Sequence, residues 1–200
     1  MRIIKGNREG STSKGYLLQD KDYLFLGEKV VLREKRWEDV AEDYAWKSDA
    51  VLARLDATMP LNLPFSLFSL AFIEELRSHE SRSRSFAIDT LAGKHIGNCM
   101  YYNLDKYRRE TEVGIIIGDS DYWGKGYGSE AVMLLVKYIF QKFKFNKVYL
   151  HTLDWNDRAL RCFGKCGFLR NGTVVRGEHS FVTMELYRNR WEEGIASQER

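Results

Sequence analysis

The sequence predicts an α+β fold, an α/β hybrid in which a mixed, mostly antiparallel central sheet of about seven strands is flanked by about four helices. Three observations predict it. β-rich runs separated by turn-forming residues fill the middle of the chain, the hydrophobic period then becomes helical, and a strand, a helix and two further strands follow. With 200 residues, 44% hydrophobic and 30% charged, the chain fits one globular domain.

One strand and two helices are expected in the first part of the chain. Residues 29–33 carry the pattern Lys-Val-Val-Leu-Arg of a short strand. Residues 37–46 have apolar side chains at helical spacing. A second helix is expected after Pro64, because an apolar stripe follows and proline suits a first helical turn.

The middle of the chain is expected to form an antiparallel meander and then a strand, helix, strand unit. The three β-rich runs are residues 85–89, 95–103 and 112–117. Residues 129–144 then keep an apolar side chain at every helical turn, and residues 147–152 return to a strand pattern.

The last elements are a helix over residues 156–166, closed by Gly167 where a left-handed cap is common, and strands over 168–176 and 180–187. The ordered domain is therefore expected over residues 28–188. Residues 1–27 are expected to form an irregular N-terminal arm, and residues 189–200 a polar tail.

Charge and cysteine content exclude several classes of partner. Lys and Arg total 31 against 28 Asp and Glu, and the basic residues are scattered, so no nucleic-acid surface is expected. The first residues lack a secretion signal and no long apolar stretch exists, which predicts a cytoplasmic protein without a membrane partner. Cys99 stands alone, and the Cys162/Cys166 pair is too weak a pattern to predict a metal.

Three alternating glycines are the strongest local signal for function. Gly124, Gly126 and Gly128 lie between a strand that ends near Ile117 and a helix that begins near Ser129. Glycines there allow close approach of the backbone to a ligand, and the free N–H groups at a helix start favour an anion such as a phosphate. The alternative is a tight turn that only requires flexibility.

Two other phosphate-binding motifs also contain glycines at close spacing. The nucleoside-triphosphate pattern Gly-x4-Gly-Lys-Ser/Thr is absent. Residues 126–131 do satisfy the dinucleotide pattern Gly-x-Gly-x-x-Ala, with Asp154 where a ribose-binding acid would stand. However, the loop does not follow directly on its strand, and too little chain follows Asp154 for the rest of a doubly wound sheet.

Two motifs together resemble the GNAT superfamily of N-acetyltransferases. Residues 123–128, Trp-Gly-Lys-Gly-Tyr-Gly, are similar to its Arg/Gln-x-x-Gly-x-Gly/Ala fingerprint, and residues 156–168 are similar to Asn-x-x-Ala-x-x-x-Tyr-x-x-x-Gly-Phe. The resemblance covers residues 28–187. Within the superfamily, the glycine loop with the following Glu130 and Ala131 looks most like the branch that acetylates ribosomal-protein N-termini.

The resemblance implies acetyl-CoA as the acetyl donor. The strand before the loop would pair with the pantetheine arm, and the loop N–H groups would receive the pyrophosphate. The second motif would line the opposite wall. The residues so implicated in cofactor binding are Ile115, Ile116, Ile117, Trp123, Gly124, Lys125, Gly126, Tyr127, Gly128, Ser129, Asn156 and Phe163.

The resemblance also implies catalytic roles. Glu112 stands where family members often carry the carboxylate that removes the proton of the amine, and Asn156 is the second candidate. The alternative for Glu112 is an exposed strand-edge glutamate beside Arg108 and Arg109. Phe163 replaces the tyrosine that usually protonates the departing sulfur, which leaves the acid role unassigned.

The function expected from the sequence is transfer of the acetyl group of acetyl-CoA to a primary amine. A protein N-terminal α-amino group is the favoured acceptor. With a pKa of about 7.8 it is neutral at pH 7 far more often than a lysine-type amine with a pKa of about 10.4, so it depends less on a catalytic base. The alternatives are a small-molecule amine (a polyamine or an aminoglycoside), a non-catalytic CoA-binding protein and a nicotinamide-dependent reductase. The oligomeric state is left open, a homodimer included.

Overall fold

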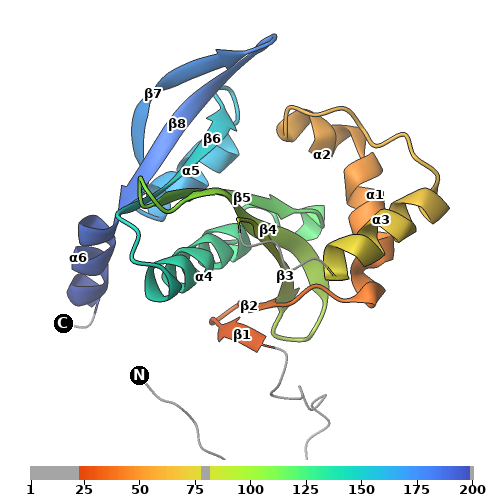
Figure 1. The fold of residues 1–200 in the computed structure, drawn as a ribbon, viewed down its shortest axis with the longest axis horizontal. Coiled ribbons are helices and arrows are strands. Elements are labelled where there is room, and N and C mark those ends of the chain that lie inside the picture. The colour runs from red at the N-terminus through yellow and green to blue at the C-terminus, as the bar shows by residue number, and fades with distance from the viewer. Residues whose placement is uncertain (1–22, 78–81, 199–200) are drawn as a thin grey trace, which may run out of the picture.

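A computed structural model describes residues 23–77 and 82–198 (Figure 1). Its strands are β1 (Tyr23–Leu26), β2 (Val30–Arg33), β3 (Arg84–Thr90), β4 (His95–Asp105), β5 (Glu110–Ile117), β6 (Lys147–Leu153), β7 (Leu169–Arg176) and β8 (His179–Tyr187). Its helices are α1 (Val40–Ser48), α2 (Ala50–Leu55), α3 (Phe65–Arg77), α4 (Tyr127–Lys142), α5 (Asp157–Lys165) and α6 (Arg188–Gln198), with short 3-10 turns η1 (Trp37–Asp39) and η2 (Ser120–Tyr122).

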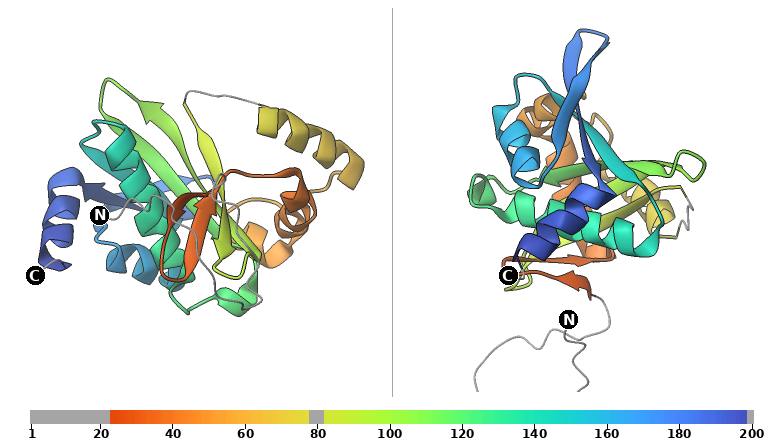
Figure 2. Two further views of the ribbon diagram at one scale, coloured as in Figure 1. Left: turned by 90° about the horizontal axis from the view of Figure 1, so that it is seen from below. Right: turned by 90° about the vertical axis from the view of Figure 1, so that its left-hand side faces the viewer.

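The strands of the described residues form one sheet in the order β1-β2-β3-β4-β5-β6-β8-β7. Every neighbouring pair is antiparallel except β5 and β6, which are parallel and joined through α4. A crossover helix between parallel strands covers one face of the sheet, and Figures 1 and 2 show α4 lying across it. The predicted fold class, a mostly antiparallel sheet flanked by helices, is confirmed.

Three elements were not predicted. β1 lies in the segment expected to be an irregular arm, α2 follows α1 directly, and α6 occupies the expected polar tail. β1 and α2 have four and six residues, too few to establish a hydrophobic period. The rest of the expected arm, residues 1–22, lies outside the described residues.

The core lies between α4 and the sheet. Val132, Leu135 and Ile139 of α4 are at most 1% exposed and pack in one cluster with Ile96 of β4 and Leu150 of β6. Their spacing of three and four residues puts them on one face of the helix, which is the period that the sequence predicted. This packing fixes the start of α4 relative to the strands on either side of it.

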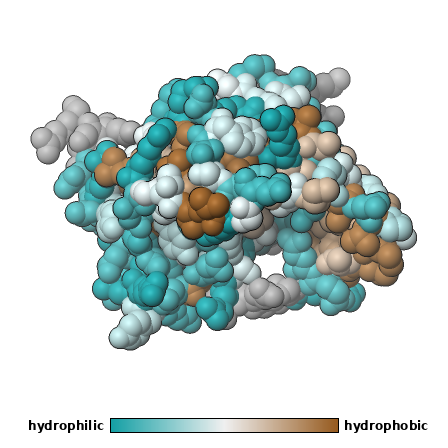
Figure 3. Space-filling view, turned by 90° about the horizontal axis from the view of Figure 1, so that it is seen from above, coloured by the Kyte–Doolittle hydropathy of each residue, from teal (hydrophilic) through white to brown (hydrophobic). Residues whose placement is uncertain are grey.

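The helices α1–α3 form a separate end of the molecule, where apolar side chains remain exposed. Leu67 and Leu70 of α3 are 52% and 61% exposed. Figure 3 shows hydrophobic residues gathered over this end. Among the described residues, no helix is both long and apolar enough to span a bilayer.

A buried network of charges joins this helical end to the sheet. Arg33 of β2 pairs with Asp39 at 2.7 Å and with Asp89 of β3 at 2.6 Å, and all three residues are 3% exposed. His95 of β4 contacts Asp43 of α1 at 3.3 Å and Asp89 at 3.4 Å. Buried charges are tolerated only when they are paired, so these contacts hold η1 and α1 in place against β2, β3 and β4.

The stability of the fold is expected to fall as pH rises from about 6.5 to 9. Burial lowers the pKa of His95, but the contacts with Asp43 and Asp89 outweigh this effect and raise it from 6.5 to about 9. A histidine whose pKa is higher in the folded than in the unfolded protein stabilises the fold fully at pH values below its unfolded pKa. This stabilisation, about 3 kcal/mol for a shift of this size, is lost once the pH rises above its folded pKa. Denaturant unfolding at a series of pH values measures the slope.

The matched comparison for this prediction is His95→Gln against His179→Gln, because His179 is exposed. The slope between pH 6.5 and 9 should flatten in the first variant and persist in the second. Equal slopes in both variants would mean that another group causes the pH dependence.

Candidate active site

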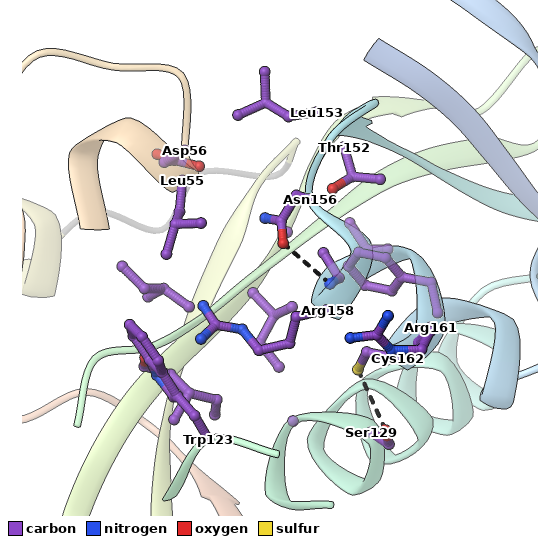
Figure 4. A pocket seen from close by; sticks show the side chains of 18 of the residues that line it. Leu55, Asp56, Trp123, Ser129, Thr152, Leu153, Asn156, Arg158, Arg161 and Cys162 are labelled. Carbon is purple, nitrogen blue, oxygen red and sulfur yellow. Dashed lines mark hydrogen bonds between the residues drawn. The ribbon is translucent and has the colours of Figure 1, made fainter. Parts of the chain in front are cut away.

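Strands β5 and β6 diverge, and a cavity opens between them. They pair only from Glu110 opposite Lys147 to Glu112 opposite Tyr149, after which the remaining half of each strand has no partner on that side. A cavity of about 450 Å³ lies in this gap, a size typical of ligand sites (Figure 4). The free edge of β5 leaves backbone N–H and C=O groups available to a ligand.

Most residues predicted to bind the cofactor line this cavity. They come from three separate segments that the fold brings together: the end of β5, the glycine loop and α5. Those lining the cavity are Ile115, Ile116, Ile117, Trp123, Gly124, Gly126, Gly128, Ser129, Asn156 and Phe163. Lys125 and Tyr127 are not among the lining residues. The ring of Tyr127 instead packs edge-on against Tyr122.

The glycine loop has the backbone geometry that requires glycine. Gly124 and Gly126 have φ of +71° and +91°, and Gly126 is the N-cap of α4. A Cβ at Gly128 would lie 3.5 Å from Ile117 and 3.8 Å from the Cys162 sulfur, so a larger side chain would fill the cavity. The helix therefore begins at Tyr127, two residues earlier than predicted, and directs its first N–H groups and positive dipole end toward the cavity.

A carboxylate that the sequence did not assign holds the loop in place. Glu130, in the first turn of α4, accepts backbone hydrogen bonds from Glu28, Lys29 and Val30 at 2.6, 2.8 and 2.9 Å. It thereby fixes the β1–β2 turn against the start of α4. The Lys29 ammonium donates to the Lys125 carbonyl at 3.0 Å, which places a cation beside the loop.

Helix α5 forms the second wall and supplies positive charge. The Asn156 side-chain oxygen caps the helix by accepting from Ala159 at 3.2 Å. Arg158, Arg161 and Lys165 line the cavity at successive turns of the helix. The sequence prediction missed these three residues, although they lie inside its second motif at helical spacing.

Trp123 fills the position where the family motif has Arg or Gln. Its indole N–H donates to the Ile117 carbonyl at 2.6 Å, and the Arg158 guanidinium lies 3.6 Å from the centre of its ring. The contact joins the glycine loop to α5 across the cavity. The indole N–H occupies one of the two acceptor sites of the Ile117 carbonyl.

Glu112 is buried behind the cavity rather than lining it. It is 5% exposed, so the alternative of an exposed strand-edge glutamate is wrong. Its carboxylate accepts from His151 Nδ1 at 2.7 Å and from Asn103 Nδ2 at 2.9 Å, and it also hydrogen bonds the Tyr102 hydroxyl. Burial and the Glu112 charge raise the pKa of Tyr102, which keeps that hydroxyl protonated.

His151 of β6 lines the cavity in front of Glu112 and was missed by the sequence prediction. With Nδ1 donating to Glu112, Nε2 carries the lone pair, and the Arg176 guanidinium lies 3.3 Å from it. The same Arg176 nitrogen lies 3.5 Å from Nδ1, so it sits over the ring and leaves the in-plane lone pair of Nε2 open to another N–H donor. The arrangement of a buried carboxylate, an oriented imidazole and an accessible ring nitrogen is that of a general base.

The opposite end of the cavity is walled by the helical part of the fold. Leu52, Leu55 and Asp56, from α2 and its C-cap, face Tyr102 and Phe181. Desolvation raises the pKa of the Asp56 carboxyl, which also contributes to the raised pKa of Tyr102. Figure 4 shows Leu55 and Asp56 at one end of the cavity and Ser129 with Cys162 at the other.

Residues 29–169 match the family model of the acetyltransferase (GNAT) domain. The chain belongs to this family. Family membership confirms the predicted superfamily and class of enzyme, an acyltransferase domain with acetyl-CoA as its donor. The matched residues include both the glycine loop and α5, so the two walls of the cavity lie within the GNAT domain.

Individual proteins of known identity are similar over parts of this GNAT domain. The spermidine N(1)-acetyltransferase of Vibrio cholerae is 27% identical over 106 residues, 52% of this chain and 61% of that protein. The aminoglycoside N(6')-acetyltransferase type 1 of Klebsiella pneumoniae is 31% identical over 91 residues, 43% of this chain and 45% of that protein. The matches therefore span about half to three-fifths of these relatives.

Similarity in three dimensions extends further. The crystal structure of spermidine N-acetyltransferase from Vibrio cholerae in complex with CoA and spermine has a TM-score of 0.74 at 19% identity, covering 83% of this chain and 99% of that chain. At this identity the likeness establishes the fold. The relatives named here are polyamine and aminoglycoside enzymes, so the finer prediction of the ribosomal-protein branch receives no support from them.

Proposed function

We propose that this protein transfers the acetyl group of acetyl-CoA to a primary amine of a small, cationic molecule of the polyamine or aminoglycoside type. The observation that carries the proposal is the opposite charge of the two ends of the cavity. Arg158, Arg161 and Lys165 lie along the wall beside the glycine loop, whereas the Asp56 carboxyl lines the other end and the Glu112 carboxylate lies behind His151 there. An anionic cofactor and a cationic acceptor fit such a cavity in one orientation.

The cofactor would occupy the end that carries the glycine loop. The N–H groups at the start of α4 and the cations of α5 suit its phosphates. The unpaired edge of β5 suits the amide groups of its pantetheine arm, which would approach the point where β5 and β6 diverge. Bound acetyl-CoA supplies an activated thioester carbonyl there.

His151 would act as the base in this reaction. The nitrogen lone pair of the acceptor forms the new C–N bond at the thioester carbonyl, the C–S bond breaks, and the sulfur leaves as thiolate. His151 Nε2 takes the proton that nitrogen loses, and Glu112 stabilises the imidazolium through Nδ1. Glu112 is thus a positioning residue, which modifies its predicted role as the base that meets the amine.

The leaving sulfur needs no strong acid. Phe163 lines the cavity where a tyrosine was expected and cannot donate a proton. A thiol with a pKa of about 8.5 leaves acceptably as its anion. The lack of a phenol at residue 163 is therefore compatible with turnover.

Ligand-induced stabilisation and thiol release test the proposal in sequence. Acetyl-CoA at about 100 times its dissociation constant should stabilise the fold by about 2.7 kcal/mol, and NADH should not. CoA release is then followed with spermidine, an aminoglycoside and a peptide with a free N-terminus. We expect turnover with a small polycation. Stabilisation by NADH alone, or turnover only with the peptide, would overturn the proposal.

Asp56→Asn is expected to raise the KM for spermidine about tenfold while kcat stays within about threefold. A carboxylate near an ammonium contributes from about 1 kcal/mol in water to a few kcal/mol in a partly buried site. Asn keeps the shape and removes the charge. Glu178→Gln, on the exposed β7–β8 turn, is the control for net charge. A KM that changes equally in both variants would count against Asp56 as an acceptor contact.

A further inference from the structure

One thiol faces the cofactor end of the cavity. Cys162 of α5 lines it and is half-buried, and its sulfur lies 3.3 Å from the Ser129 hydroxyl (Figure 4). The sulfur is also 3.8 Å from the position that a Cβ on Gly128 would occupy. No part of the proposed reaction uses this thiol.

The surroundings of Cys162 favour its thiolate. Ser129 belongs to the first turn of α4, where the helix dipole is positive. Contacts with Cys166 and Ser129 and the positive charges of Lys165 and Arg158 lower the pKa of Cys162 below its usual value despite burial. Because the thiolate is the nucleophile, a thiol of this kind in an accessible cavity is reactive at neutral pH.

The other two cysteines of the chain are internal controls. Cys99 is 0% exposed, and burial raises its pKa. Cys166 is 4% exposed, donates to the Ser129 carbonyl at 3.3 Å, and has a raised pKa through Cys162 and burial. Under conditions in which Cys162 reacts, both thiols should remain protonated and shielded from solvent.

We propose that Cys162 is a modification site at which low-molecular-weight disulfides form a mixed disulfide that blocks the end of the cavity beside the glycine loop. The inference rests on the proposed function, since it assumes that acetyl-CoA binds at this end of the cavity. The thiolate attacks one sulfur of the disulfide RSSR, the new Cys162–S–S–R bond forms, the old S–S bond breaks, and the second half leaves as thiolate RS⁻. Atoms and electrons balance without another oxidant, and a reducing thiol reverses the step.

Geometry favours a lasting mixed disulfide over an internal one. Cβ atoms four residues apart on a helix are about 5–6 Å apart, whereas a disulfide needs about 3.5–4.5 Å. Cys166 can therefore displace the added group only by unwinding the end of α5. The group bonded to Cys162 therefore stays in the cavity, beside Gly128 and the free edge of β5.

Oxidised glutathione is the probe for this site. The protein is incubated with it at pH 7.5, and the added glutathionyl group is located by peptide mass spectrometry with and without saturating CoA. We expect modification at Cys162 at least about 100-fold faster than at Cys99 or Cys166, and slowed at least about tenfold by CoA. The fully modified protein should lose stabilisation by acetyl-CoA, and dithiothreitol should restore it.

The variant Cys162→Ala is incubated with oxidised glutathione in parallel. Acetyl-CoA should stabilise this variant equally before and after the incubation. Stabilisation that survives full modification of Cys162, or modification that CoA does not slow, would overturn this inference alone. Absence of acetyl-CoA stabilisation in the untreated protein would overturn the proposed function, and the inference with it.

Discussion

Replacing His151 with glutamine is expected to lower kcat/KM by about 10²–10⁴, the usual contribution of a general base. His151 lines the cavity and is held by a buried carboxylate, at 2.7 Å from Glu112, whereas Tyr102, the other cavity side chain that hydrogen bonds Glu112, stays protonated. Glutamine is polar and of similar reach but cannot accept the proton. Steady-state thiol release with spermidine measures the loss, and stabilisation by acetyl-CoA should be unchanged because His151 contacts Glu112, Arg176 and Tyr149, none of which belongs to the glycine loop.

The pH profile separates a catalytic from a structural role. The inflection that an imidazole base gives to kcat/KM should vanish in His151→Gln, whereas Glu112→Gln should keep it with a lower plateau. His179→Gln, at an exposed histidine on β8, should behave as the parent. A kcat/KM within about threefold of the parent in His151→Gln would exclude the imidazole as the base.

Replacing Arg33 with methionine is expected to lower the free energy of unfolding by about 3–5 kcal/mol, because it removes the cation that two buried carboxylates share and leaves only Asp89 with a second cationic partner, His95. Arg33 bonds Asp39 through two nitrogens and Asp89 through a third. The side chain of methionine fills much of the same space, so the effect reports the charge. Denaturant unfolding monitored by circular dichroism measures it.

The matched control is Arg170→Met, on the exposed strand β7, which should change the free energy of unfolding by no more than about 0.5 kcal/mol. The double variant Arg33→Met with Asp89→Asn should recover part of the loss, because one uncompensated charge is removed with the cation. A loss below about 1 kcal/mol in Arg33→Met would show that the network does not hold the helical end against the sheet.

The sequence by itself determined the features that depend on local patterns. The helical period of α4 and the β-rich runs of β3, β4 and β5, separated by turn-forming residues, identified the main elements. Gly124 and Gly126 marked a loop with special backbone geometry, and their positive φ excludes most other residues. Together with the Asn156 helix cap, these local requirements were enough to predict the family, and most residues predicted to bind the cofactor line one cavity.

The tertiary structure alone decided what lies at the other end. Glu112 and His151 are 39 residues apart, and they meet only because β5 and β6 pair in one register and then diverge. Asp56 reaches the same cavity from a six-residue helix, and Glu130 bonds a turn 100 residues earlier in the chain. Register and the packing of short elements depend on non-local contacts, which leave no period in the sequence. For that reason the sequence predicted the glycine loop and its candidate role, whereas the candidate base and the opposite end of the cavity became visible only in the folded chain.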